Sequence, residues 1–224
     1  MGPRFRFVGR LGVADAVTVT NAALGFVAVV VAPRAPVTAA RLVLLAAIAD
    51  ALDGILARRY GGTEAGPYLD SLADVASFVV APAVLVATRG LAAWDGLAAE
   101  AVAVAVPALF VAMGVVRLGL YTAYDSEADE TRGVQTTLAA TVLAASVLAD
   151  LVTPPALVAL TLVLAVLMVC RVTYPDLHPQ DASVMGLVQA AAIVARGWIG
   201  RGFAYALLFL ALAYLLFAPR WYWS

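Results

Sequence analysis

Long apolar runs restrict the fold of this chain more than any other feature. Most of them are about 18–25 residues long, the length that an α-helix needs to cross the hydrocarbon of a bilayer. With 64% hydrophobic and 13% charged residues, the chain is more apolar than a water-soluble domain. Backbone groups inside a membrane must be hydrogen-bonded within the protein, which leaves helices or a closed barrel. The runs lack the short alternation of barrel strands, so we expect an all-α polytopic membrane protein.

We expect a single integral membrane domain over residues 1–224. Its apolar segments are 14–32, 37–57, 68–88, 97–121, 134–150, 155–172, 183–196 and 202–218. The first six predict a six-helix transmembrane catalytic core over about residues 14–172. The last two predict a C-terminal helical hairpin over about residues 183–218. The seventh segment is short and punctuated by Gly186 and Gly197, so it is either partly spanning or interfacial.

Arginine in short connections predicts the orientation of the chain. Arg4, Arg6 and Arg10 precede the first span. Arg58 and Arg59 lie in the connection between the second and third spans, on the same side of the membrane. We therefore expect an integral plasma membrane protein in which this side faces the cytoplasm.

Four carboxylates lie at the ends of two neighbouring spans. Asp50 and Asp53 are three residues apart near the end of the second span, and Asp70 and Asp74 are four apart near the start of the third. Spacings of three and four place side chains on one face of a helix. Because the connection is short, the two helices are antiparallel neighbours. We expect all four carboxylates to converge at one membrane face.

Such carboxylates repel one another and are costly to remove from water at the edge of the hydrocarbon. Two divalent cations would offset their charge, and an all-oxygen ligand set suits Mg²⁺ or Mn²⁺, with Ca²⁺ as a further candidate. Two such ions about 4 Å apart stabilise the attacking and leaving oxygens in displacement at phosphorus. The sequence thus predicts a binuclear metal centre with the ligands Asp50, Asp53, Asp70 and Asp74.

The residues around these acids resemble the signature of the CDP-alcohol phosphatidyltransferase family, D-x-x-D-G-x-x-A-R followed by G-x-x-x-D-x-x-x-D. Besides the four aspartates, the matching residues are Gly54, Ala57, Arg58 and Gly66. The gap between Arg58 and Gly66 is one residue shorter than the commonest form, in a loop where length changes are tolerated. The specific part of the resemblance covers about residues 18–137.

This resemblance implies an enzyme that transfers the phosphatidyl-type group of a CDP-lipid to an alcohol and releases CMP. The metal centre would hold the diphosphate, and Asp74 would also be the catalytic base that removes the acceptor's proton. Gly54, Ala57 and Gly66 would line the nucleotide site. Arg58 would lie near the phosphates. The resemblance further implies a homodimer, and the net charge of −1 excludes a large basic surface for nucleic acid.

Two stretches resemble the phosphatidylserine synthase branch of the family. Residues 70–83 read D-S-L-A-D-V-A-S-F-V-V-A-P-A, and Thr18, Asn21, Gly25 and Phe26 match T-x-x-N-x-x-x-G-F. The branch implies L-serine as the acceptor, with Thr18 and Asn21 contacting the nucleotide or its phosphates; helix packing is their alternative role. The arginine-only, acidic composition fits a salt-adapted archaeon, whose donor would be CDP-archaeol. A bacterial donor would be CDP-diacylglycerol.

The fourth span departs from the branch in the region expected to meet the acceptor. Arg117 is kept, but Leu120 stands where a second arginine is usual, and Gln135 stands where proline is expected. We predict that Arg117 binds an anionic group, either the serine carboxylate or a lipid phosphate. The alternative is that its side chain reaches the membrane interface without a ligand.

Two other functions are open. The same chemistry on glycerol 3-phosphate or inositol phosphate would need a dense basic pocket, for which Arg58, Arg59 and Arg117 are the evident candidates. A divalent-cation transporter would place its acids near mid-span on discontinuous helices, whereas these acids lie at span ends. Single acids such as Asp15 and Asp150 are better explained as helix caps or partners of arginine.

Overall fold

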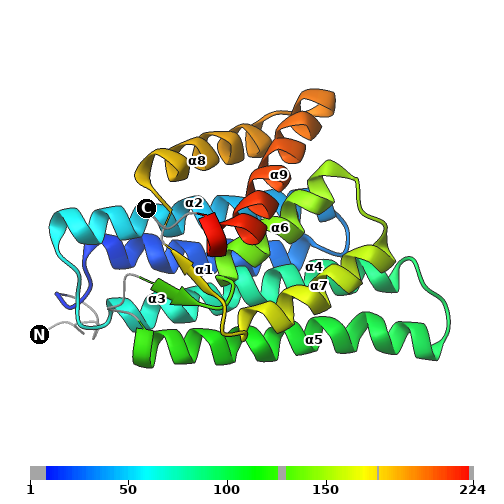
Figure 1. The fold of residues 1–224 in the computed structure, drawn as a ribbon, viewed down its shortest axis with the longest axis horizontal. Coiled ribbons are helices and arrows are strands. Elements are labelled where there is room, and N and C mark those ends of the chain that lie inside the picture. Colours follow the sequence, from blue (N-terminus) through cyan, green and yellow to red (C-terminus); the bar gives the residue numbers. More distant parts are fainter. Residues whose placement is uncertain (1–8, 126–129, 176, 222–224) are drawn as a thin grey trace, which may run out of the picture.

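The computed structural model describes residues 9–125, 130–175 and 177–221, and most of this part of the chain is helical (Figure 1). In chain order the helices are α1 (Val13–Val31), α2 (Pro36–Tyr60), α3 (Gly66–Asp74), the π-helix η1 (Val75–Val80), α4 (Ala81–Leu91), α5 (Leu97–Leu120), the π-helix η2 (Tyr121–Asp125), α6 (Thr136–Ala149), α7 (Pro154–Met168), α8 (Pro179–Val194) and α9 (Gly197–Trp221). Arg4 and Arg6, used above to predict the orientation, lie outside the described residues.

Four helical stretches of the described chain are long and apolar enough to cross a membrane: Val13–Val31, Gly66–Leu91, Leu97–Tyr124 and Gly197–Trp221. The chain is thus an integral membrane protein by the length and composition of its helices. α2 has 25 residues but carries acids and arginines, and α6, α7 and α8 have 14, 15 and 16 residues. The six-helix core and the C-terminal hairpin therefore stay predictions.

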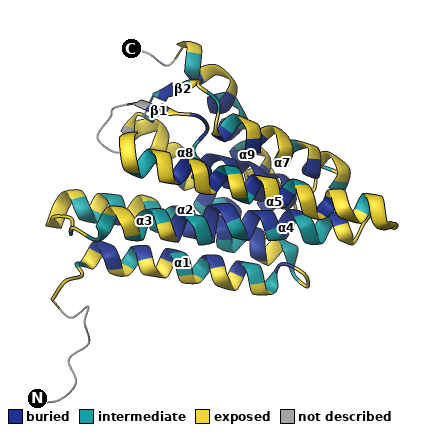
Figure 2. Ribbon diagram, turned by 90° about the horizontal axis from the view of Figure 1, so that it is seen from below, coloured by how far each residue is buried: buried dark blue, intermediate teal, exposed yellow. Residues whose placement is uncertain are grey.

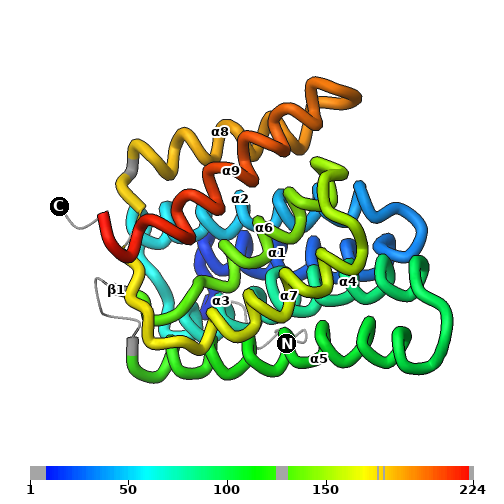
Figure 3. The backbone as a smooth tube through the Cα atoms, turned by 45° about the vertical axis from the view of Figure 1, so that its right-hand side comes forward, coloured from blue at the N-terminus to red at the C-terminus, as the bar shows by residue number. Residues whose placement is uncertain are grey.

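α6 lies at the centre of the bundle. Its residues from Leu138 to Ala149 are all buried, and it packs against α2, α7 and α9. Figure 3 shows α9 running across α6. A helix that is apolar on all sides and covered on all sides belongs to a protein core. The outer faces of α1 and α5 carry exposed residues instead (Figure 2), many of them large and apolar, as contact with lipid requires.

The first helix comes unusually close to η1, and glycine makes this contact possible. A Cβ added to Gly25 would lie 2.7 Å from Cα and 2.8 Å from N of Ser77. Ser77 also donates a hydrogen bond of 2.8 Å from Oγ to the backbone oxygen of Asn21. This contact fixes α1 against the continuous helix Gly66–Leu91, which carries two of the predicted metal ligands.

Two short strands, β1 (Glu130–Arg132) and β2 (Thr173–Pro175), pair antiparallel with Thr131 opposite Tyr174. The expected all-α fold did not include this small sheet. It joins the connection before α6 to the connection after α7. Gly133 follows β1 and has a φ of 75°, which favours glycine. Its amide donates a hydrogen bond of 2.8 Å to the oxygen of Val172. The sheet lies at the same end of the bundle as α3 (Figure 1).

Candidate active site

Asp50 near the end of α2 and Asp70 and Asp74 in α3 bring their carboxylates together. Each offers an oxygen, and these oxygens lie within 4.8 Å of one another. Asp74 is buried, and its Oδ1 has no hydrogen-bond partner among the described residues. Like charges this close, in a partly dry environment, repel strongly. The spacing and the all-oxygen donor set therefore fit a divalent cation, with these three residues able to hold it.

Asp53, the fourth predicted ligand, is not part of this group of three. Its Oδ2 accepts a hydrogen bond of 2.6 Å from Oγ1 of Thr18 in α1. The side chain lines a neighbouring cavity together with Asp70. The structure therefore brings three of the four predicted ligands within 4.8 Å of one another and holds the fourth beside Thr18, on the adjoining cavity wall.

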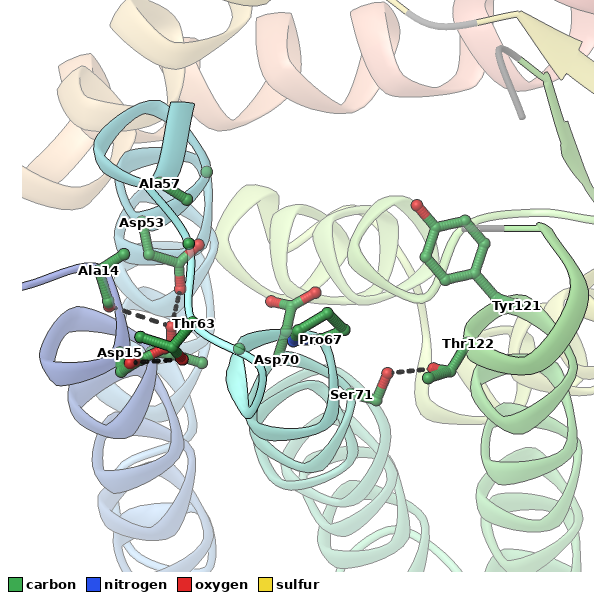
Figure 4. Close-up of a pocket in the computed structure, with 14 residues that line it drawn as sticks. Ala14, Asp15, Asp53, Ala57, Thr63, Pro67, Asp70, Ser71, Tyr121 and Thr122 are labelled. Atoms are coloured by element: carbon green, nitrogen blue, oxygen red, sulfur yellow. Dashed lines mark hydrogen bonds between the residues drawn. The ribbon is translucent and has the colours of Figure 1, made fainter. Parts of the chain in front are cut away.

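That first cavity has a volume of about 330 Å³ and is built from α1, α2, α3, η2 and the connection between α2 and α3 (Figure 4). The predicted site residues on its wall are Thr18, Asp53, Gly54, Ala57, Gly66 and Asp70. The wall residues that were not predicted as site residues are Ala14, Asp15, Gly62, Thr63, Pro67, Ser71, Tyr121 and Thr122. Glycine and alanine keep part of the wall free of long side chains, so a ligand can approach the backbone.

Two sets of hydrogen bonds fix the rim of this cavity (Figure 4). Asp15 Oδ2 accepts hydrogen bonds of 2.7 Å from the amide of Gly12 and 2.9 Å from Oγ1 of Thr63. Asp15 thus caps α1, as the sequence suggested, and also ties α1 to the connection between α2 and α3. On the opposite side, the hydroxyls of Ser71 and Thr122 are hydrogen-bonded and join α3 to η2.

Two predicted nucleotide contacts, Asn21 and Arg58, do not line the cavity. Asn21 in α1 is fully buried, and neither polar atom of its side chain has a partner in the described part of the chain. Arg58 is exposed in the last turn of α2. Its guanidinium Nη1 lies 3.6 Å from the position that a Cβ on Gly54 would take, so Gly54 leaves the helix face open beneath this side chain.

A second, polar cavity of about 170 Å³ adjoins the first, which it meets at Asp70, and its wall includes Asp50, Asp70, Asp74, Arg117 and Gln135. Arg117 is buried, with 7% of its surface exposed. Its guanidinium carbon lies 5.1 Å from the ring centre of Tyr121, within the range of a cation–π contact. The predicted base and the predicted anion-binding arginine therefore share one cavity.

Arg117 also lines a third cavity of about 290 Å³, together with Arg132 of β1 and Arg171. No local sequence pattern indicates this grouping, because the three arginines are far apart along the chain. The pairing of β1 with β2 and the end of α7 bring Arg132 and Arg171 to the end of α5. Positive charge beside the carboxylates is therefore denser than Arg58, Arg59 and Arg117 alone indicated.

The fold and the carboxylate cluster define an integral membrane protein with a candidate metal-binding site at one end of its helical bundle. A sequence model of the CDP-alcohol phosphatidyltransferase family matches residues 11–222. The chain belongs to this family, and the predicted resemblance is confirmed. Family members transfer a phosphatidyl-type group from a CDP-lipid to an alcohol, generally with a divalent metal.

The chain is also similar to the archaetidylserine synthase of Methanothermobacter thermautotrophicus. The two sequences are 28% identical over 173 residues, which is 75% of this chain and 72% of the relative.

Proposed function

We propose that this protein transfers the phosphatidyl-type group of a CDP-lipid to the hydroxyl of L-serine and releases CMP. The observation that carries the proposal is the cluster of Asp50, Asp70 and Asp74 on the wall of the smaller cavity, where Asp70 also lines the larger one. The larger cavity has motif residues on its wall and suits the cytidine diphosphate. The smaller one contains Arg117 and suits a small acceptor with a carboxylate. Similarity to an archaetidylserine synthase supports serine.

In the proposed reaction the serine hydroxyl oxygen attacks the phosphorus that carries the lipid. The bond from this phosphorus to the oxygen of CMP breaks, and CMP leaves with that oxygen and its electron pair. Asp74 takes the hydroxyl proton, because a hydroxyl is a poor nucleophile at neutral pH without a positioned base. Asp74 suits this role since it borders the acceptor cavity and has one oxygen without a partner among the described residues.

We propose that Asp50, Asp53, Asp70 and Asp74 hold two divalent ions, Mg²⁺ or Mn²⁺, with Ca²⁺ as a further candidate. When bound, such ions neutralise the negative charge that develops on the leaving phosphate. The chain itself contributes pre-positioned oxygens. α2 and α3 supply three of them within 4.8 Å, and the hydrogen bond from Thr18 fixes the orientation of Asp53.

For the donor, the cavity wall supports Thr18, Gly54, Ala57 and Gly66 as neighbours of the nucleotide. Arg58 would reach the phosphates from the last turn of α2, as an exposed guanidinium can. The position of Asn21 supports its alternative role, helix packing, because the residue is fully buried and does not line the cavity.

Glycerol 3-phosphate or inositol phosphate is the second candidate acceptor, and one observation favours it. Arg117, Arg132 and Arg171 line a cavity next to the carboxylates. A phosphate monoester carries more negative charge than the serine zwitterion, and guanidinium groups bind phosphate oxygens in pairs. Serine remains the proposed acceptor because the relative named above is a serine enzyme by its name.

We propose the plasma membrane as the location, with the carboxylates facing the cytoplasm. Arg58 and Arg59 lie at the same end of the bundle as the carboxylates, which agrees with the enrichment of arginine in cytoplasmic connections. The homodimer stays a prediction. A cation transporter has no support from the family to which the chain belongs.

The test is CMP release by the purified full chain with Mg²⁺ or Mn²⁺. CDP-diacylglycerol and CDP-archaeol are compared as donors, and serine, glycerol 3-phosphate, inositol phosphate or no acceptor is added. Serine-dependent release with an equal amount of serine-headed lipid supports the proposal. Release that depends only on a phosphorylated acceptor replaces serine by the second candidate. Asp70→Asn serves as the inactive variant, and Asp95→Asn, exposed between α4 and α5, serves as its matched control.

A further inference from the structure

The end of the bundle opposite to the carboxylates contains another charged cavity, of about 280 Å³. It is enclosed by α2, α4, α6, α8 and α9, and its charged residues are Arg41, Arg89, Arg201 and Asp150. Arg41 precedes Asp53 on α2 by twelve residues, which is about 18 Å of helix. In Figure 1 this end lies at the turn between α8 and α9, away from α3.

The cavity carries more positive than negative charge. Arg201 pairs with Asp150 at 3.6 Å, but both side chains are about 60% exposed, at 60% and 62%, and such pairs contribute little to stability. Arg41 and Arg89 have no carboxylate within ion-pairing distance in the described chain. Two guanidinium groups therefore line this cavity without an ion-pair partner among the described residues.

Some N–H donors of these two guanidinium groups have no hydrogen-bond partner among the described residues. Nη2 of Arg41 donates a hydrogen bond of 2.9 Å to the backbone oxygen of Ala195, at the end of α8. The Nε atoms of Arg41 and Arg89 are buried and have no partner among the residues that the structure describes. A buried charged donor without an acceptor is costly. An anion with several acceptor oxygens in this cavity would supply acceptors to these guanidinium groups.

Two helices, α2 and α9, begin at this cavity, and three, α4, α6 and α8, end there. α2 begins at Pro36 without a side-chain cap, and Pro36 and Val37 line the wall. α9 begins at Gly197, and Gly197 and Gly200 line the wall as well. The first-turn amides of a helix attract anions. Arginines and helix starts from different parts of the chain thus converge on one volume.

We propose that this cavity binds the phosphate group of a membrane lipid, in the leaflet opposite to the catalytic site. α1, which is long and apolar enough to cross a membrane, begins at the larger active-site cavity and leads into Pro36 at this cavity, so the two sites face opposite interfaces. Val37, Val147 and Leu148 supply apolar wall beside the arginines, as the glycerol and upper chain of a lipid require. The bound lipid would hold the turn between α8 and α9 against α2 and α4.

Native mass spectrometry of the full chain in detergent tests this proposal. The probes are dioleoylphosphatidylglycerol, dioleoylglycerol as the lipid without phosphate, and inorganic phosphate as a competitor. Arg89→Gln is expected to lower the retention of phosphatidylglycerol about tenfold, since it removes a charge-assisted contact, and Arg89→Lys is expected to restore part of it. Asp150→Asn is expected to raise retention. Arg34→Gln is the matched control, because Arg34 is exposed in the α1–α2 connection at the same end and does not line the cavity.

Equal loss in Arg89→Gln and Arg34→Gln would overturn the proposal, as would equal retention of phosphatidylglycerol and dioleoylglycerol. Displacement of the lipid by millimolar inorganic phosphate would overturn the lipid assignment in favour of a free anion. Thermal unfolding of each variant checks that the fold is intact, and Asp150→Asn decides the outcome if Arg89→Gln does not fold. The measurement does not use CMP release, so its result is independent of the catalytic proposal.

Discussion

Thr18 and Asp53 are joined by a hydrogen bond of 2.6 Å between α1 and α2. The donor is a hydroxyl in the first helix, and the acceptor is a carboxylate of the family motif in the second. The bond fixes Asp53 on the wall of the larger cavity instead of leaving it to swing towards Asp50. A residue outside the aspartate motif therefore orients one of the motif's acids.

Thr18→Val is expected to lower kcat/KM for the CDP-lipid about tenfold, because hydrogen bonds to charged groups contribute roughly 1.5–3 kcal/mol. Thr18→Ser keeps the hydroxyl and is expected to stay close to wild type. The measurement is initial CMP release at saturating acceptor. Wild-type kinetics in Thr18→Val would show that Asp53 needs no orienting partner.

Asp70→Asn is expected to abolish turnover and to weaken Mn²⁺ binding, because it removes one of the three carboxylates that lie within 4.8 Å. Electron paramagnetic resonance of added Mn²⁺ measures the binding, and CMP release measures the turnover. Asp95→Asn removes an exposed acid away from the site and is expected to change neither. Near-normal activity in Asp70→Asn would rule out the binuclear centre.

Asp74→Asn is expected to lower kcat by about 10²–10⁴, the usual contribution of a general base, while the CDP-lipid still binds. Equilibrium binding of the CDP-lipid and single-turnover CMP release separate the two effects. A variant that loses binding but retains its rate at saturating substrate would make Asp74 a ligand and not the base.

Arg171→Gln is expected to raise KM for a phosphorylated acceptor about tenfold and to leave KM for serine and for the CDP-lipid unchanged, since Arg171 lines the basic cavity beside Arg117 and not the smaller cavity proposed for serine. Arg59→Gln is the matched control, because Arg59 is exposed at the end of α2 with its guanidinium carbon 5.5 Å from the ring centre of Tyr60. The reverse pattern, a raised KM for the donor, would indicate that the basic cavity binds the lipid phosphate instead of the acceptor.

Gly25→Ala is expected to destabilise the protein by about 1–3 kcal/mol, the usual cost of overpacking, because the added methyl would meet backbone atoms of Ser77. Adding Ser77→Ala is not expected to restore stability, since it removes only Oγ. Thermal unfolding in detergent is the measurement. Gly202→Ala, which has open space around the added atom, is expected to be neutral. Equal midpoints for the two variants would contradict the close approach.

The sequence predicts the positions of the helices well because apolar run length is a direct consequence of crossing a bilayer. Helices cover each of the eight apolar segments. Hydropathy cannot tell a lipid-facing helix from one enclosed by protein, since both are apolar, so the central position of α6 was not predictable. The β1–β2 pair was missed because Thr131 and Tyr174 meet across about forty intervening residues, with no strand pattern on either side.

The convergence of carboxylates was predictable where it depends on the spacing of residues within neighbouring helices. Helical spacing brings Asp50, Asp70 and Asp74 together as expected. Asp53 lies outside this group of three carboxylates. Its carboxylate accepts a hydrogen bond from Thr18, which belongs to another helix. Arg171 follows α7 and was not identified, because its proximity to Arg117 depends on tertiary packing.

The packing of α9 on α6 has a consequence for how the protein is made. α6 is buried along its length, and α9, the last helix of the described chain, is one of the helices that cover it. During synthesis α6 emerges long before α9, so until α9 arrives part of its surface must face lipid or the insertion machinery. The bundle therefore closes only as its last helix is inserted. Ribosomes stalled before residue 197 should hold a chain whose central helix is open to crosslinking from the bilayer.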